Sequence, residues 1–262
     1  MLFSEVLGSL APRDGELAVS VPADWMQGRS VFGGLQTALA IQAMRTLVPA
    51  DYPLRAVQTT FIGPVEGGVR LRVAVLRTGK SVIHAEARIL TGDQTAALIV
   101  GVFGRGRPSQ AEVAARAPSH MPQGEPFDFS FVEGVSPAFL RHFAMRWHAG
   151  ALLFTGARDA RHALLEVGMD DPVPANECHI LALADAPPPL ALAMLTRPAP
   201  GSSVTWTMEY LVDRFDAYPL SGWRVHAELR AGRDGYTNQE VMLCAPDGTP
   251  VALSYQTMMV FG

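Results

Sequence analysis

Three polar side chains in the second half of the sequence could take part in acid–base chemistry: Asp185, Glu228 and Gln256. A carboxylate can accept a proton from a bound water, and an amide can orient that water through its own donors and acceptor. Each residue also has a structural interpretation. Asp185 is typical of a helix N-cap, Glu228 falls on the polar face of an alternating strand, and Gln256 could pair with neighbouring backbone. The residue types therefore allow catalysis without establishing it.

A pair of glycines, Gly33 and Gly34, precedes the most apolar stretch of the chain. This stretch predicts a helix over residues 34–48, about 20 Å long. Because it is apolar on nearly all sides, we expect it to be buried. The first N–H groups of a helix have no partner within it and lie at the positive end of its dipole. The glycines let a ligand, or only another backbone, approach these N–H groups.

Strand-like segments follow this helix. They are rich in Val, Ile, Leu and Thr and are bounded by glycine-containing turns, at residues 55–62, 69–77, 81–90 and 95–103. Long antiparallel strands after one buried helix predict a sheet that curls around that helix. A segment punctuated by glycine and proline then predicts a linker over residues 105–137.

The second half repeats this order. Residues 75–80 align with residues 228–233, at an offset of about 153 to 155 residues. A helix is expected beside the prolines at 187–189, with Asp185 or Ala186 as its cap and proline in its first turn. Two copies of one unit predict a fused dimer whose two-fold interface is internal. Its strand-like segments are residues 139–148, 203–212, 222–231, 236–244 and 250–260.

The composition is that of a globular protein with a well-filled core. The 262 residues are 48% hydrophobic and 18% charged, with a net charge of −4, which argues against a nucleic-acid partner. Two cysteines, Cys178 and Cys244, are too few for a disulfide framework. With no signal peptide and no apolar run of membrane-spanning length, we expect a cytoplasmic protein without a membrane partner.

The histidines are dispersed without metal-ligand spacing, so neither a metal site nor another cofactor is expected. Ser254 lacks the Gly-x-Ser-x-Gly context of a nucleophilic serine, so serine catalysis is not expected either. The histidines are His84, His120, His142, His148, His162, His179 and His226.

Four segments together resemble the acyl-CoA thioesterase II family of double hotdog proteins. They are RSVFGG at residues 29–34, TFIGP at 60–64, LRTGKS at 76–81 and DGTPVALSYQ at 247–256. The resemblance covers roughly residues 20–104 and 140–262. It implies an α+β fold of two tandem hotdog repeats, each a long antiparallel sheet wrapped around one central helix. The expected division is an N-terminal hotdog at residues 1–104, a linker at 105–137 and a C-terminal hotdog at 138–262.

The resemblance also implies hydrolysis of an acyl-CoA, or a related pantetheine thioester, by an activated water. The family's water-orienting set is an aspartate, a serine or threonine, and a glutamine. In an ungapped alignment the glutamine is Gln256, whereas the aspartate falls on Trp206 and the hydroxyl residue on Glu228. The Glu228 carboxylate could then serve as the base. Asp185 is a further acid–base candidate.

The expected substrate site follows from the same resemblance. The acyl chain would lie near Phe32, Leu35 and Trp206, with the thioester at the N–H groups of Gly33 and Gly34. An indole at this place would narrow the acyl tunnel and select short or flat acyl groups. The departures from the family pattern keep open a non-catalytic acyl-CoA or lipid-binding protein, and also a purely structural partner-binding domain. A homo-oligomer of the double unit is a further expectation.

Overall fold

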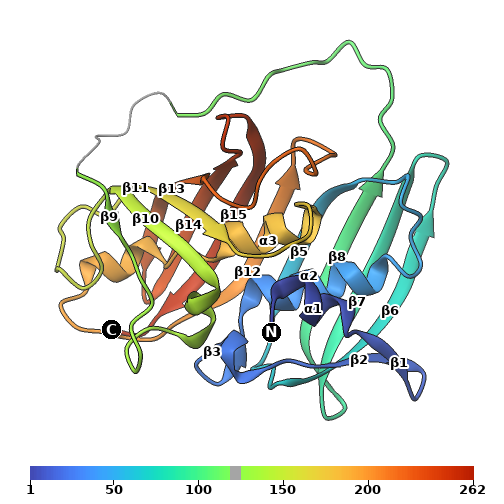
Figure 1. Cartoon of the computed structure of the whole chain (residues 1–262), viewed down its shortest axis with the longest axis horizontal. Helices are drawn as coiled ribbons and strands as arrows, with labels where there is room; N and C mark the ends of the chain where they lie inside the picture. Colours follow the sequence, from blue (N-terminus) through green and yellow to red (C-terminus); the bar gives the residue numbers. More distant parts are fainter. Residues whose placement is uncertain (119–124) are drawn as a thin grey trace.

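The computed structural model describes residues 1–118 and 125–262. In the first half a single long helix, α2 (Gly33–Met44), lies across a sheet of long strands (Figure 1). A short helix and a small hairpin precede it: α1 (Phe3–Gly8), the 3-10 turn η1 (Ala23–Trp25), β3 (Met26–Gln27) and β4 (Ser30–Val31). The sheet strands of this half are β1 (Ala11–Arg13), β2 (Glu16–Ser20), β5 (Leu54–Phe61), β6 (Gly68–Thr78), β7 (Val82–Thr91) and β8 (Gln94–Gly104).

The second half repeats this arrangement around α3 (Glu177–Asp185). Its 3-10 turns are η2 (Ala138–His142) and η3 (Leu190–Met194). Its strands are β9 (Phe127–Asp128), β10 (Phe143–Ala149), β11 (His162–Met169), β12 (Gly201–Tyr210), β13 (Trp223–Arg233), β14 (Tyr236–Cys244) and β15 (Pro250–Val260).

The two halves share one continuous sheet, as expected for a fused dimer. Its strand order is β1-β2-β6-β7-β8-β5-β12-β15-β14-β13-β11-β10-β9, so β5 and β12 join the halves. These two strands pair antiparallel, with Val57 opposite Met208 and Thr59 opposite Trp206. Strands that would otherwise be free edges therefore satisfy each other's backbone groups. The double hotdog architecture expected from the sequence is confirmed.

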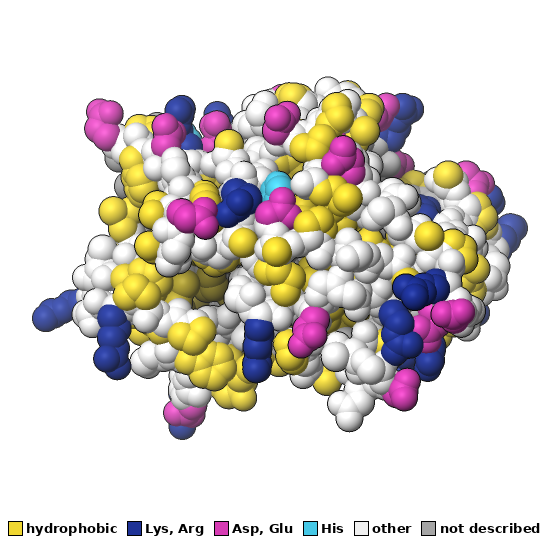
Figure 2. All heavy atoms as spheres, turned by 60° about the horizontal axis from the view of Figure 1, so that its bottom comes forward, with side chains coloured by type: hydrophobic (Ala, Val, Ile, Leu, Met, Phe, Trp, Pro, Cys, Tyr) yellow, Lys and Arg dark blue, Asp and Glu magenta, His cyan; other side chains and the backbone are white. Residues whose placement is uncertain are grey.

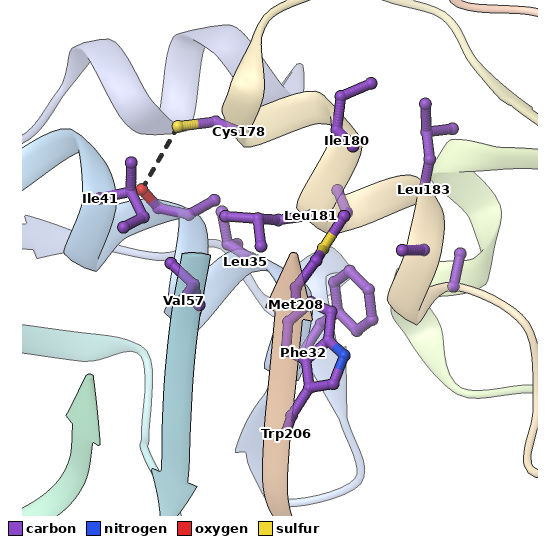
Figure 3. Close-up of a cluster of buried hydrophobic side chains, with 14 of the residues drawn as sticks. Phe32, Leu35, Ile41, Val57, Cys178, Ile180, Leu181, Leu183, Trp206 and Met208 are labelled. Atoms are coloured by element: carbon purple, nitrogen blue, oxygen red, sulfur yellow. Dashed lines mark hydrogen bonds between the residues drawn. The ribbon is translucent and has the colours of Figure 1, made fainter. Parts of the chain in front are cut away.

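The two central helices run antiparallel, and the first turn of each contacts the middle of the other. A Cβ atom on Gly34 would lie only 3.1 Å from the Cα atom of Ala182. The reciprocal contact joins Cys178, whose Sγ lies 3.6 Å from the carbonyl oxygen of Ala38 (Figure 3). Cys178 follows Gly34 by the same 144 residues that separate Ala182 from Ala38. The helix pair thus obeys an internal two-fold symmetry.

An ion pair ties the C-terminal end of α2 to the first turn of α3. The Arg45 guanidinium donates to both carboxylate oxygens of Glu177, at 2.6 and 2.7 Å. The Tyr210 hydroxyl donates to the Glu177 carbonyl oxygen at 2.8 Å. A bidentate pair of this kind is stronger and more directional than a single surface contact. It fixes how the two helices are positioned lengthwise.

The prediction that α2 is buried on nearly all sides is confirmed, since ten of its twelve residues are buried. The helix ends at Met44 rather than at the expected residue 48. Thr46 caps the last turn by donating its hydroxyl to the Ala43 carbonyl oxygen, and Leu47 is exposed. Pro49 follows, and the residue before a proline disfavours helical conformation.

The prediction for the second helix was wrong in its boundaries. Asn176 is the N-cap of α3, because its side-chain oxygen accepts from the N–H groups of Cys178 and His179. The prolines at 187–189 end the helix instead of opening it. Asp185 is therefore the last residue of α3 and not an N-cap.

Two further expectations concern the region between the halves. The strand expected over residues 139–148 is a 3-10 turn, η2, followed by β10. Residues 105–118 contain no helix or strand, whereas Pro122 and His120 lie outside the described residues. Among the helices of the described residues, none is both long and apolar enough to cross a membrane.

Replacing Leu39 with alanine tests the central position of α2. This side chain is completely buried, so the substitution should lower the free energy of unfolding by about 2–5 kcal/mol. Urea unfolding followed by tryptophan fluorescence measures the change. Gln42→Ala, at an exposed position of the same helix, is the matched control and should change stability by less than about 0.5 kcal/mol. Equal effects of the two substitutions would contradict the buried position.

Candidate active site

Three side chains from separate parts of the second half meet in one hydrogen-bonded group. The Gln256 Nε2 atom donates to Asp185 Oδ1 at 3.1 Å and to Ser203 Oγ at 2.7 Å. Asp185 ends α3, Ser203 lies near the start of β12 and Gln256 lies in the middle of β15. A carboxylate, an amide and a hydroxyl are thereby held together, which is a donor and acceptor set suited to orienting water.

The antiparallel helix pair places the Asp185 carboxyl group over the start of α2. A Cβ atom on Gly33 would lie 2.9 Å from Asp185 Oδ2 and 3.2 Å from the Phe61 ring. A side chain at residue 33 would therefore displace the carboxylate or the ring. Gly34 has a different task, because its missing Cβ lets α2 approach Ala182. The close approach of another backbone is therefore observed at Gly34, while access of a ligand at Gly33 stays a prediction.

Ser203 reaches the group because β12 contains a bulge. The pairing of β12 with β15 shifts between Ser203 and Thr205, and Ser203 lies opposite Met258. Met258 is buried on the helix-facing side of the sheet. Strict alternation from Trp206 would have turned Ser203 to the outer face, so the sequence pattern hid this residue. Bulges often reorient a side chain beside a functional site.

Gln256 belongs to a row of side chains on the helix-facing side of the sheet. Its cross-strand neighbours are Trp206 on β12 and Gln239 on β14. Gln256 is 9% exposed and Gln239 is 4% exposed, so each needs a hydrogen-bond partner. The Gln239 Oε1 atom accepts from the backbone N–H of Leu190 at 2.9 Å. This bond attaches the segment after α3 to the sheet beside Gln256.

The pKa of the Asp185 carboxyl group is raised toward neutrality. Desolvation raises its pKa from 3.8 to about 7, against smaller lowering contributions from Gln256 and from the backbone N–H of Gly34. A carboxyl group with a pKa near neutrality can both accept and return a proton. The shift arises because the ionised form loses hydration under two helices and a sheet.

Glu228, expected as a base, is not part of this group. It lies on β13 opposite Glu240, which in turn lies opposite Tyr255. These residues share the outer face of the sheet, whereas Ala227 is buried on the inner one. The Glu228 carboxylate forms an ion pair with Arg230 at 2.7 Å. The alignment placed the hydroxyl residue of the set on β13, whereas the hydroxyl of this hydrogen-bonded group, Ser203, comes from β12.

Trp206, on which the ungapped alignment placed the family's aspartate, lies opposite Gln256 but makes no hydrogen bond to this group. Trp206 is only 1% exposed, and its indole N–H donates to Ser254 Oγ at 2.8 Å. Phe32, the residue before α2, is also completely buried and stacks on Phe139 with ring centroids 4.2 Å apart. Both aromatic residues belong to the buried cluster shown in Figure 3.

A cavity lies at the opposite end of the helix pair from Asp185. It measures about 360 Å³ and is lined by the first turn of α3 and by the loop after β12.

In the part of the chain that the structure describes, no three histidine, cysteine, aspartate or glutamate side chains are arranged to hold a metal ion.

The sequence matches one protein family over most of its length. The acyl-CoA thioesterase N-terminal domain matches residues 21–104, and the acyl-CoA thioesterase C-terminal domain matches residues 111–260. Together the two matches span far more than half of the chain. The protein therefore belongs to the acyl-CoA thioesterase family, whose reaction is hydrolysis of an acyl-CoA thioester. Among curated proteins, none matches the chain in sequence.

Solved structures support the same fold. A hot dog fold protein from Alicyclobacillus acidocaldarius is 20% identical, with a TM-score of 0.85, and the match covers 99% of this chain and 98% of that one. An acyl-CoA thioesterase II from Mycobacterium marinum is 14% identical, with a TM-score of 0.74, and the match covers 99% of this chain and 98% of that one. At these identities the likeness concerns the fold alone.

The raised pKa of Asp185 predicts a stability cost. Since the folded-state pKa of about 7 exceeds the ordinary 3.8, the folded protein binds this proton more tightly than the unfolded chain does. Its contribution to stability therefore falls as pH rises from about 4 to about 7. Asp185→Asn should raise the melting temperature at about pH 8 and raise it much less at about pH 4. Calorimetry at both pH values tests this, and equal shifts at both would contradict it.

Proposed function

We propose that Asp185, Gln256 and Ser203 hold the water that hydrolyses the acyl-CoA thioester. The observation that carries this proposal is the double hydrogen bond of the Gln256 amide, to Asp185 Oδ1 and to Ser203 Oγ. It joins an aspartate, a serine and a glutamine, the three residue types of the family's water-orienting set. These three side chains supply every member of that set.

The hydrogen-bond inventory leaves suitable atoms for a water molecule. Both hydrogens of the Gln256 Nε2 atom are used, so its Oε1 atom remains as an acceptor. Ser203 Oγ accepts from Gln256, so its own hydrogen remains available. A water bound between Gln256 Oε1, Ser203 Oγ and the Asp185 carboxylate would direct one of its protons at Asp185, the proposed base.

Asp185 acts as a general base in the proposed reaction. It takes a proton from the water as the water oxygen attacks the thioester carbonyl carbon. The tetrahedral intermediate then collapses, the carbon–sulfur bond breaks, and the Asp185 carboxyl group returns the proton to the departing thiolate. A group whose pKa is about 7 suits both transfers near neutral pH.

The start of α2 supplies the donor for the oxyanion. Backbone N–H groups in the first turn of a helix lack intrahelical partners and lie at its positive end. The Gly34 N–H interacts with the Asp185 carboxyl group, which leaves the Gly33 N–H for the developing negative charge. Of the two expected donors, the N–H groups of Gly33 and Gly34, only that of Gly33 is then assigned to the oxyanion.

The wider setting is proposed from the composition and the shape of the surface. Figure 2, with the lower side of Figure 1 turned forward, shows hydrophobic side chains gathered around a hollow. The β3–β4 hairpin, which leads directly into α2, lies at this lower side (Figure 1). We propose that acyl-CoA approaches here, in the cytoplasm, without a nucleic-acid or membrane partner. The net charge of −4 argues against a nucleic-acid partner.

Substitution of the three polar side chains should lower turnover while leaving the fold intact. Asp185→Asn should reduce kcat/KM for a good acyl-CoA by about 100-fold or more, because proton transfer from water is lost. Gln256→Ala and Ser203→Ala should each reduce it by at least about tenfold. Thiol release followed with a chromogenic disulfide measures all three.

Glu228→Gln is the matched control, because this carboxylate lies on the outer face of the sheet. Its kcat/KM should stay within about twofold of the wild type. A large loss in Glu228→Gln, or full activity in Asp185→Asn, would sink the assignment.

The pH dependence should follow the ionisation of Asp185. Since the carboxylate form is the active one, kcat/KM should rise with pH and level off above the pKa of about 7. An inflection near the ordinary carboxyl value of 3.8 would contradict a base whose pKa is raised by desolvation. Measurement at low substrate concentration in buffers of constant ionic strength separates these outcomes.

A further inference from the structure

The space behind the polar group is occupied by a tryptophan. Trp206 and Gln256 face each other across β12 and β15, on the same side of the sheet. On its other side Trp206 neighbours Thr59, whose hydroxyl lies 3.2 Å from that of Thr37 on α2. The indole therefore lies between Gln256 and the body of the other half.

Its orientation is fixed by one hydrogen bond. The indole N–H donates to Ser254 Oγ at 2.8 Å, and Ser254 lies opposite Met208. The ring thus leans along the strands toward Met208, away from Ser203 and Asp185. Because the bond is buried, releasing the indole would leave both polar groups unpaired.

The side chains around the indole are buried. Met208, Leu35 and Leu181 are completely buried, as is Phe32, and all four belong to the cluster in Figure 3. Above this layer the two helices are in close contact at Gly34 and Ala182. An acyl chain that extends past Gln256 toward the centre of the molecule would meet the indole.

The internal symmetry identifies the residue of the first half that is equivalent to Trp206. Ile62, directly after β5, donates its N–H to the Ala96 carbonyl oxygen, and Leu211, directly after β12, donates to that of Val251. Counting back from these equivalent residues pairs Trp206 with Val57. Figure 3 shows both side chains directed from their strands toward the helices. The large residue occurs only at the end that carries Asp185.

We propose that Trp206 closes the acyl end of the site and restricts the substrate to short acyl thioesters. This inference rests on the proposed function and names its substrate class. Acetyl and butyryl groups end before the indole, whereas octanoyl and palmitoyl groups require it to move. Trp206 is thus a specificity-determining residue and takes no part in proton transfer.

The test compares kcat/KM for acetyl-, butyryl-, octanoyl- and palmitoyl-CoA in the wild type and in variants. The wild type should favour acetyl- or butyryl-CoA. Trp206→Leu should raise the octanoyl-to-acetyl ratio of kcat/KM by about tenfold or more, because a hydrophobic pocket discriminates by volume. Trp206→Phe, which is gentler on folding, should raise the same ratio by a few-fold.

Val57→Ala is the matched control, since Val57 is the equivalent, completely buried residue at the other end. It should leave the octanoyl-to-acetyl ratio unchanged even where it lowers the melting temperature. A wild type that prefers palmitoyl-CoA overturns the inference and leaves the proposed hydrolysis standing. So does an unchanged ratio in a folded Trp206→Phe or Trp206→Leu protein. No hydrolysis of any acyl-CoA by the wild type overturns both.

Discussion

The contact between the antiparallel helices α2 and α3 is the constraint on which the rest of the structure depends. Gly34 and Ala182 bring the two backbones together, and the bidentate Arg45–Glu177 pair fixes their lengthwise position. This geometry carries the last residue of α3, Asp185, over the first turn of α2. The positive end of one helix dipole and the negative end of the other then act on the same carboxyl group. Desolvation of the carboxylate outweighs the favourable interaction with the N-terminal end of α2, so the pKa of Asp185 is raised.

The fold could be predicted from the sequence because its signals are long and repeated. The apolar stretch after Gly34 is buried on nearly all sides, and the strand segments alternate over many residues. The boundaries were less visible where capping decides them. Asn176 begins α3 by accepting from two backbone N–H groups, and the three prolines after Asp185 read equally well as the start of a helix. Knowing the N-cap would have placed Asp185 at the C-terminal end.

The candidate site could be predicted only in part, and for a physical reason. Gln256 lies on a regular strand, so its side of the sheet followed from alternation. Ser203 lies beyond a bulge, which reverses the side to which its hydroxyl points. Asp185 comes from a different element altogether. An alignment without gaps along the strands therefore found Gln256 and assigned the other two members to Trp206 and Glu228. Asp185 was named as an acid–base candidate only from its place beside the second helix.

Covalent linkage of the two halves removes a restriction that a symmetric homodimer cannot escape. In a homodimer, any substitution appears at both ends of the helix pair at once. In this chain the end of α2 near Glu177 carries an ion pair where the other end carries Gly33 and Asp185. Glu177 follows Gly33 by the same 144 residues that relate the two helices to each other. One position of the repeated unit can therefore carry an ion-paired carboxylate in one half and, in the other, a glycine that leaves room for the Asp185 carboxyl group.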